Sequence, residues 1–314
     1  MHGMPSVLRP LLTANERSAE PVLRSVVERH GYRVDTQVKL SHLLSSRPPG
    51  ITDEQWRYAK MAELDFLVSS DETTLPEFAV ELDDRTHRTT DAWDRDAKKD
   101  AVCAAAGLEL LRVESSAFKR GPRGRLLVDY LIDARSYMSA FSDAQEAGYI
   151  PYDEPGDYRS VIDLAEGGGI DYVNDLAMPA RVAAFVAHDA GLVSSPIVNV
   201  ASVYRVDGWV DGFAWMDATG DRCLFQRTSL RSYRLACGIG PGELAQDIAV
   251  AALGDDLDGL GRDEAVLRRT ADVAAAFDKA VAAAEEGLRL TLFKQAVDMW
   301  EDNRTRTVAK DRPC

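Results

Sequence analysis

Acidic residues occur within two segments of this sequence that otherwise have the composition of buried strands. The first reads E-L-D-F-L-V from Glu63 to Val68, and the second reads F-A-V-E-L-D-D from Phe78 to Asp84. An ionised carboxylate is costly in an apolar interior unless a cation or a hydrogen-bonding partner holds it. Carboxylate oxygens are also the ligands that Mg²⁺ and Mn²⁺ prefer in proteins. The two segments therefore predict a site where carboxylates bind a divalent metal ion.

Strand alternation indicates which of these acids project together. Successive side chains of a strand point to opposite faces of a sheet, so Glu81 and Asp83 would share one face of the second segment. Asp65 would project from the first segment on the side opposite to its apolar neighbours. If the two strands pair, Asp65 lies beside Glu81, and we expect these two residues to be the metal ligands, with Asp83 close by. The alternative is a solvated strand face, or ion pairs between these acids and nearby arginines.

Two further side chains could take part in catalysis at such a metal site. His87 follows Asp83 by four residues, where the strand should end, and could deprotonate a water molecule or bind a phosphate. On the helix expected next, Lys99 shares a face with Asp96 and Cys103 through spacings of three and four residues. Lys99 could then reach the site and stabilise charge on a phosphoryl oxygen. Taken separately, each is a common surface residue, a loop histidine and a helix lysine.

The elements that would position these side chains follow one another in an α/β order. A helix, a strand, a helix, two strands, a helix, a strand and a helix are expected, and they predict a mixed central sheet flanked by helices. The expected segments are 13–31, 32–40, 52–61, 63–68, 77–83, 91–106, 108–113 and 123–148. Thr13 and Glu16 form a capping box at the start of the first helix, and Gly31 and Gly107 favour helix ends.

The combined pattern resembles the PD-(D/E)XK nuclease superfamily, and most of all the branch of very-short-patch-repair endonucleases and their bacterial relatives of unassigned function. The resemblance covers about residues 11–115. The matching residues are Thr13 with Glu16, Gln37 with Val38, Asp65 with Phe66, Glu81 to Asp84 with His87, Asp96 with Lys99, and Ala106 and Gly107 with Leu110 to Val113.

This resemblance implies a restriction-endonuclease-like core in which Asp65 and Glu81 hold Mg²⁺ or Mn²⁺. It implies that Glu16 lies near the site, where it could join the catalytic group, although its capping-box role is the simpler interpretation. It also implies that His87 is a catalytic base or a phosphate ligand. We therefore expect a magnesium-dependent endonuclease that hydrolyses DNA phosphodiester bonds, with a role in bacterial defence or DNA repair.

One departure from the superfamily pattern supports a different function. The position two residues after Glu81, which usually holds a lysine, holds Asp83 in this sequence, and Lys99 is the expected substitute from the helix. Without that substitution the expected function is a catalytically silent, nuclease-like module that binds nucleic acid or a protein partner. The net charge of −14 also favours this alternative.

Length and charge indicate a second domain. A chain of 314 residues is long enough for two domains, and Pro151–Asp157 has the composition of a linker. We therefore predict a nuclease-like domain over 1–150 and an α+β domain over 158–314. Residues 1–150 carry 20 Lys and Arg against 24 Asp and Glu, whereas residues 151–314 carry 17 against 27. We expect the more acidic second domain to contact a protein partner, a ligand or a second copy of the chain.

The second domain is expected to combine a small sheet with helices. Strands are expected over 197–206, 209–216 and 223–227, and helices over 178–191, 243–253 and 262–302. No segment has the roughly 18 uncharged apolar residues that a membrane span needs, and the first twelve residues do not match a secretory signal. Four widely spaced cysteines include no C-x-x-C pair, which argues against a zinc site and a disulfide framework. We therefore expect a cytoplasmic protein without a membrane partner.

Overall fold

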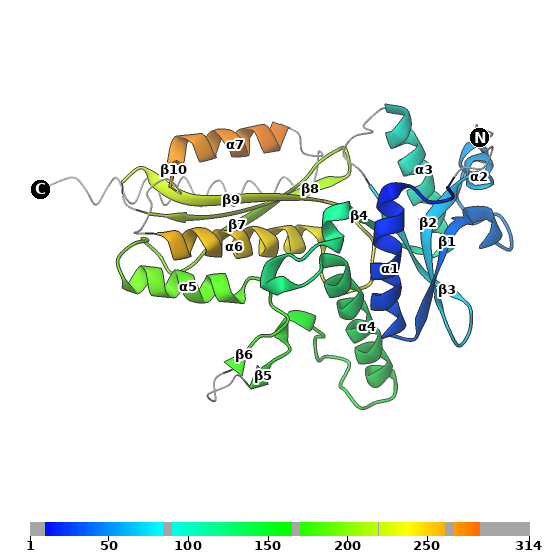
Figure 1. The fold of residues 1–314 in the computed structure, drawn as a ribbon, viewed down its shortest axis with the longest axis horizontal. Coiled ribbons are helices and arrows are strands. Elements are labelled where there is room, and N and C mark those ends of the chain that lie inside the picture. Colours follow the sequence, from blue (N-terminus) through cyan, green and yellow to red (C-terminus); the bar gives the residue numbers. More distant parts are fainter. Residues whose placement is uncertain (1–9, 84–89, 165–169, 219, 261–266, 283–314) are drawn as a thin grey trace, which may run out of the picture. The chain divides into compact units, whose positions relative to one another are not determined.

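The chain divides into two compact units in the computed structural model, which describes residues 10–83, 90–164, 170–218, 220–260 and 267–282 (Figure 1). The first unit comprises Met1–Tyr152 together with Tyr233–Cys237, and the second comprises Asp153–Ser232 with Gly238–Cys314. The chain passes from the first unit to the second within the predicted linker. The return of a short segment to the first unit was not predicted.

A four-stranded mixed sheet with the strand order β1-β2-β3-β4 forms the centre of the first unit. Tyr32–Lys39 (β1), Glu63–Ser70 (β2) and Pro76–Leu82 (β3) are antiparallel neighbours, and Glu109–Val113 (β4) runs parallel to β3. Parallel neighbours need a crossover connection, and α3 (Thr90–Ala106) lies within it. The predicted mixed α/β class is confirmed.

Helices cover both faces of this sheet (Figure 1). Helices α1 (Ala14–Glu28) and α4 (Leu127–Glu146) pack together on one face, where the Arg135 guanidinium lies 4.9 Å from the centre of the Phe78 ring. Helix α3 covers the other face, with α2 (Asp53–Ala59) beside it. The buried side chains between α3 and the sheet include Leu67, Ala79, Val102, Cys103 and Leu110. The first unit also contains the 3-10 helices Leu40–His42, Ser115–Phe118 and Pro122–Gly124.

A segment from the second half of the chain pairs with the outer side of β4. The Leu110 N–H donates to the Arg234 carbonyl at 2.9 Å, and the Arg234 N–H donates to the Leu110 carbonyl at 3.0 Å. The Glu109 carboxylate accepts the Ala236 N–H at 2.8 Å. These bonds satisfy backbone groups that an open sheet edge would leave to solvent or to another chain.

A separate antiparallel sheet with the order β10-β9-β8-β7 forms the centre of the second unit. Its strands are Asn199–Tyr204 (β7), Trp209–Asp217 (β8), Arg222–Arg231 (β9) and Arg268–Arg269 (β10). Helix α6 (Pro241–Gly259) packs on one face and α7 (Thr270–Ala282) on the other. The remaining elements are Tyr158–Ser160 (3-10), Asp163–Leu164 (β5), Ile170–Asp171 (β6) and Met178–Asp189 (α5).

The prediction of one continuous helix over 262–302 is wrong near its start. Arg268 and Arg269 pair with β9 as a short strand, and the helix begins only at Thr270. The Thr270 N–H and hydroxyl both donate to the Asp221 carbonyl, at 2.8 and 2.9 Å, which fixes the start of α7 against the turn before β9. Alanine-rich composition favours a helix here, but it does not reveal this pairing with a distant strand. Residues 283–302 lie outside the described part of the chain.

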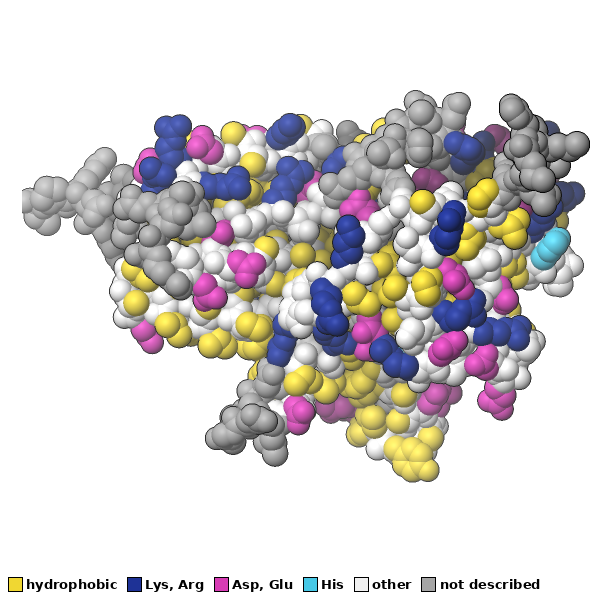
Figure 2. All heavy atoms as spheres, in the orientation of Figure 1, with side chains coloured by type: hydrophobic (Ala, Val, Ile, Leu, Met, Phe, Trp, Pro, Cys, Tyr) yellow, Lys and Arg dark blue, Asp and Glu magenta, His cyan; other side chains and the backbone are white. Residues whose placement is uncertain are grey.

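Helix α5 packs against α6 through its alanines and presents larger side chains outward. Figure 2 shows hydrophobic side chains gathered along α5, at the lower left of the view. The buried residues of α5 are Ala180, Ala184 and Ala187, and the hydrophobic residues more than half exposed are Val182, Phe185 and Val186. None of the helices that the structure describes is long and apolar enough to cross a membrane.

Candidate active site

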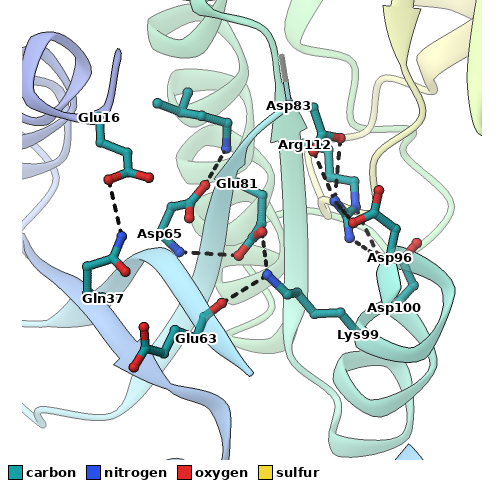
Figure 3. Close-up of polar contacts among 11 residues, drawn as sticks. Glu16, Gln37, Glu63, Asp65, Glu81, Asp83, Asp96, Lys99, Asp100 and Arg112 are labelled. Atoms are coloured by element: carbon teal, nitrogen blue, oxygen red, sulfur yellow. Dashed lines mark hydrogen bonds and ion pairs between the residues drawn. The ribbon is translucent and has the colours of Figure 1, made fainter. Parts of the chain in front are cut away.

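The acidic residues of β2 and β3 meet on the sheet face that α3 covers (Figure 3). Phe66 pairs with Val80, so the preceding Asp65 and the following Glu81 lie side by side. The Asp65 N–H donates to Glu81 Oε1 at 3.2 Å, and the Leu82 N–H donates to Asp65 Oδ2 at 2.9 Å. The predicted pairing of the two strands, and with it the proximity of the two carboxylates, is confirmed.

Lys99 reaches these carboxylates from α3. Its Nζ donates to Glu81 Oε2 at 2.6 Å and to the Glu63 carbonyl at 2.9 Å. The Lys99 and Glu81 side chains are only 10% and 7% exposed, so their salt bridge is largely removed from water. Replacing one partner of such a pair with a neutral residue leaves the other partner as an uncompensated buried charge. The prediction that Lys99 can reach the site from this helix is confirmed.

Burial and neighbouring charge together set the protonation of this group. Burial, with the charge of Glu81, raises the pKa of Asp65 to about 7, although the Leu82 N–H favours the carboxylate. Burial alone would lower the pKa of Lys99, but the charge and hydrogen bond of Glu81 outweigh it and raise that pKa. Lys99 is therefore an ammonium at neutral pH. A cation placed beside Asp65 would favour its ionised form.

A second buried cation, Arg112 of β4, lies next to this pair. Arg112 is the register partner of Glu81 and is 3% exposed. Its Nη1 donates to Asp83 Oδ1 at 3.2 Å and to Asp96 Oδ1 at 3.3 Å. Its Nε and Nη2 donate to Asp100 Oδ1 at 3.1 and 2.9 Å. Burial opposes the charge of this guanidinium, but the three carboxylates outweigh burial and raise the pKa of Arg112.

The Arg112 cluster changes the interpretation of Asp83. Asp83 was expected close to the two metal ligands, and the structure places it in an ion pair with Arg112, which was the alternative for these acids. Arg112 and Asp100 were not predicted as members of the site. A signal was present, because an arginine inside the apolar segment L-E-L-L-R-V poses the same conflict as the acids of β2 and β3.

Glu16 lies at the N-terminus of α1, on the β1 side of Asp65 (Figure 3). It is 8% exposed, and its Oε2 accepts the Thr13 N–H at 2.8 Å and the Gln37 side-chain amide at 3.2 Å. The predicted capping box is confirmed. Gln37 has a φ of 53°. It lies between two residues of β1 that pair with Phe66 and Leu64 of β2, and it is therefore opposite Asp65. The charge of Glu16 contributes to the raised pKa of Asp65, so the two carboxylates are within electrostatic reach.

The residues present can provide part of a magnesium site. Across the described ranges, no group of three or more His, Cys, Asp or Glu side chains is arranged to hold a metal ion. Asp65 and Glu81 offer two adjacent carboxylates, and proteins commonly hold Mg²⁺ through one or two carboxylates with water and phosphate oxygens completing the shell. Asp65 Oδ1 accepts no hydrogen bond from the residues that the structure describes. His87 lies outside the described residues, and its role stays a prediction.

Similarity to a known family is found over part of the first unit. Residues 8–124 match a family described as a protein of unknown function, DUF2726. No curated protein and no solved structure matches the chain. The match covers less than half of the 314 residues, but it includes every residue of the candidate site from Glu16 to Arg112.

Proposed function

We propose that the first unit is a restriction-endonuclease-like nuclease of the PD-(D/E)XK type, which hydrolyses DNA phosphodiester bonds with Mg²⁺ or Mn²⁺. The contact of Lys99 Nζ with Glu81 Oε2, beside Asp65, carries this proposal. Two acids and a lysine are the groups that the superfamily uses. Here the lysine comes from α3 instead of from the strand that carries Glu81.

Each side chain would have a distinct task in this reaction. Asp65 and Glu81 would hold the metal ion, which when bound supplies Lewis-acid stabilisation of the phosphate and a more acidic water. The Lys99 ammonium would stabilise negative charge that develops on a phosphoryl oxygen. His87 is proposed as the group that accepts the proton of the attacking water. The packing of α3 on the sheet keeps the ammonium and the carboxylates in a fixed relation.

A catalytically silent module is the second candidate, and one observation favours it. Lys99 already donates to Glu81 and to the Glu63 carbonyl within the protein. In a silent module this pair would only stabilise the fold, and the surrounding surface would bind nucleic acid or a protein partner. The net charge of −14, which repels DNA phosphates, also favours this candidate over a nuclease.

Cleavage assays with the full chain distinguish the two candidates. Supercoiled plasmid and single-stranded DNA are incubated with Mg²⁺, with Mn²⁺ or with EDTA, and the variants are Asp65→Asn, Glu81→Gln and Lys99→Met. We expect metal-dependent cleavage by the wild type and a loss of about 100-fold or more in each variant. Cleavage that persists in Asp65→Asn and Glu81→Gln contradicts the assigned site. No cleavage by the wild type with either metal favours the silent module.

Two matched variants serve as controls, because each removes one charge from the first unit and leaves the residues of the candidate site unchanged. Lys98 precedes Lys99 on α3, but its Nζ pairs with Glu54 instead of Glu81. Asp35 of β1 has a side chain that is 51% exposed, and it forms an ion pair with Arg33 at 3.7 Å. Lys98→Met and Asp35→Asn should therefore retain the cleavage rate of the wild type.

A further inference from the structure

We propose that Arg112 is a positioning residue that fixes where the Lys99 ammonium lies, an inference that rests on the proposed nuclease function. Arg112 makes none of its hydrogen bonds to Lys99 or Glu81. It acts instead through the residues on either side of that pair, namely Asp83, Asp96 and Asp100.

The Arg112 guanidinium joins the helix that carries Lys99 to the sheet. Asp96 and Asp100 lie one turn apart on α3, and Lys99 lies within the same turn. A planar guanidinium donates in fixed directions, so its bonds to both aspartates fix the rotation and the axial position of that turn.

On the sheet side, Arg112 stands at the level of Glu81. The two residues are register partners on β4 and β3, and Asp83, which also accepts from Arg112, lies two residues beyond Glu81. One guanidinium therefore ties the helix turn of Lys99 to the strand ends beside its carboxylate partner. A displacement of α3 by about 1 Å would be enough to misplace the ammonium for catalysis.

The same cluster also controls which carboxylate pairs with Lys99. Three aspartates surround Arg112, and without this guanidinium they would be alternative partners for the Lys99 ammonium in a partly buried region where charges interact strongly. Both carboxylate oxygens of Asp83 and one each of Asp96 and Asp100 accept from Arg112, and Glu81 is the carboxylate that Lys99 binds. Asp83 occupies the position where the superfamily usually has a lysine. Here Asp83 accepts from Arg112, and Arg112 in turn positions Lys99.

Arg135 provides a matched control in the same unit. It is 8% exposed, and it donates to Glu77 at 3.0 Å and to Glu109 at 3.2 and 3.3 Å. These two acids lie at the starts of β3 and β4, whereas Arg112 lies towards their ends. An arginine-to-lysine change at either position keeps the charge and removes the fork of donors. Only the change at Arg112 affects a residue that contacts α3.

The first measurement does not depend on activity. The folded full chain receives a short pulse of acetic anhydride at neutral pH, and mass spectrometry compares acetylation of Lys99 with that of the exposed Lys119. In Arg112→Lys we expect Lys99 labelling to rise about tenfold, because the charge-assisted hydrogen bond between Lys99 and Glu81 would be weakened. Arg135→Lys should leave the labelling of Lys99 at the wild-type level.

The second measurement is the kinetics of DNA cleavage. Arg112→Lys should lower kcat by about 100-fold and leave KM nearly unchanged, because a misplaced Lys99 affects the transition state more than substrate binding. Arg135→Lys should retain the wild-type kcat. Asp100→Asn is a second variant, and it should fold normally because the Asp100 side chain is 47% exposed. It should change Lys99 labelling and kcat in the same direction as Arg112→Lys.

Two outcomes overturn the proposal, and a third bears on the proposed function alone. Unchanged Lys99 labelling in both Arg112→Lys and Asp100→Asn overturns the positioning role. An equal rise in Arg112→Lys and Arg135→Lys also overturns it, since that result reports general loosening of the unit. If the wild type cleaves no DNA, the proposed function fails, and the labelling still decides whether Arg112 sets the position of Lys99.

Discussion

At the scale of single residues, the two neighbouring lysines of α3 should differ in how much they contribute to the free energy of unfolding. Lys99 is buried with Glu81, whereas Lys98 pairs with Glu54 at the surface. Lys99→Met should lower the free energy of unfolding by about 3–5 kcal/mol, because Glu81 would stay buried without its cation. Lys98→Met should change it little, since surface ion pairs contribute little to stability. Urea unfolding of both variants measures the difference, and equal losses would contradict the buried pair.

The raised pKa of Asp65 predicts a pH-dependent cost of folding. Between the ordinary value of 3.8 and about 7, the folded chain binds a proton at Asp65 that the unfolded chain has released. The free energy of unfolding therefore falls as pH rises through this window. Without divalent metal, the wild type should lose more stability than Asp65→Asn between about pH 5 and about pH 8.

Urea unfolding of the two chains at both pH values, in EDTA, measures this effect. Asp35→Asn serves as the control, because its side chain is half exposed and it should follow the wild type. Parallel pH dependences for the wild type and Asp65→Asn would show that Asp65 is not held protonated by burial and Glu81.

At the scale of elements, a glycine lets α6 lie directly on β8. A Cβ atom at Gly212 would come within 2.2 Å of the backbone carbonyl of Ala245. Gly212→Ala should therefore push the helix from the sheet and lower the free energy of unfolding by about 3 kcal/mol, the upper part of the range for overpacked cores. Gly259→Ala, near the end of α6, has open space around its Cβ and should be nearly neutral.

Thermal unfolding of the two glycine variants tests this contact. The transition to follow is that of the second unit, which contains both substitutions. A Gly212→Ala chain as stable as Gly259→Ala would show that α6 and β8 can separate at low cost.

Element-scale patterns also explain what the sequence could predict. The helical spacing of Asp96, Lys99 and Cys103 identifies the inner face of α3, and strand alternation identifies the faces of Asp65 and Glu81, because both periodicities are local. The partners of Arg112 depend on the parallel pairing of β3 with β4, which no local pattern specifies. The short strand at Arg268–Arg269 was missed for the same reason, since its partner residues Arg222 and Cys223 are remote in sequence.

At the scale of the whole molecule, the first unit is not a continuous stretch of sequence. A fragment of residues 1–152 lacks Tyr233–Cys237, which pairs with β4 in the full chain. In this fragment the Leu110 amide should exchange at least about tenfold faster relative to Leu67 of the central strand β2, because its hydrogen-bond partner is missing. An open edge should also promote self-association of the fragment.

Hydrogen exchange by NMR and light scattering measure these two effects. A second fragment, in which a flexible linker joins residues 1–152 to residues 230–240, should recover the protection of Leu110 and remain monomeric. Equal exchange of Leu110 in both fragments would show that the returning segment does not protect β4.

The returning segment also constrains how the protein is made. About 120 residues separate Val113, the end of β4, from Tyr233. At typical synthesis rates of about 5–20 residues per second, the ribosome needs roughly 6–24 seconds to add them. During this interval Leu110, on the edge of β4, is without its outer partner Arg234. The nascent first unit is therefore completed only after the strands β7, β8 and β9 of the second unit have been translated.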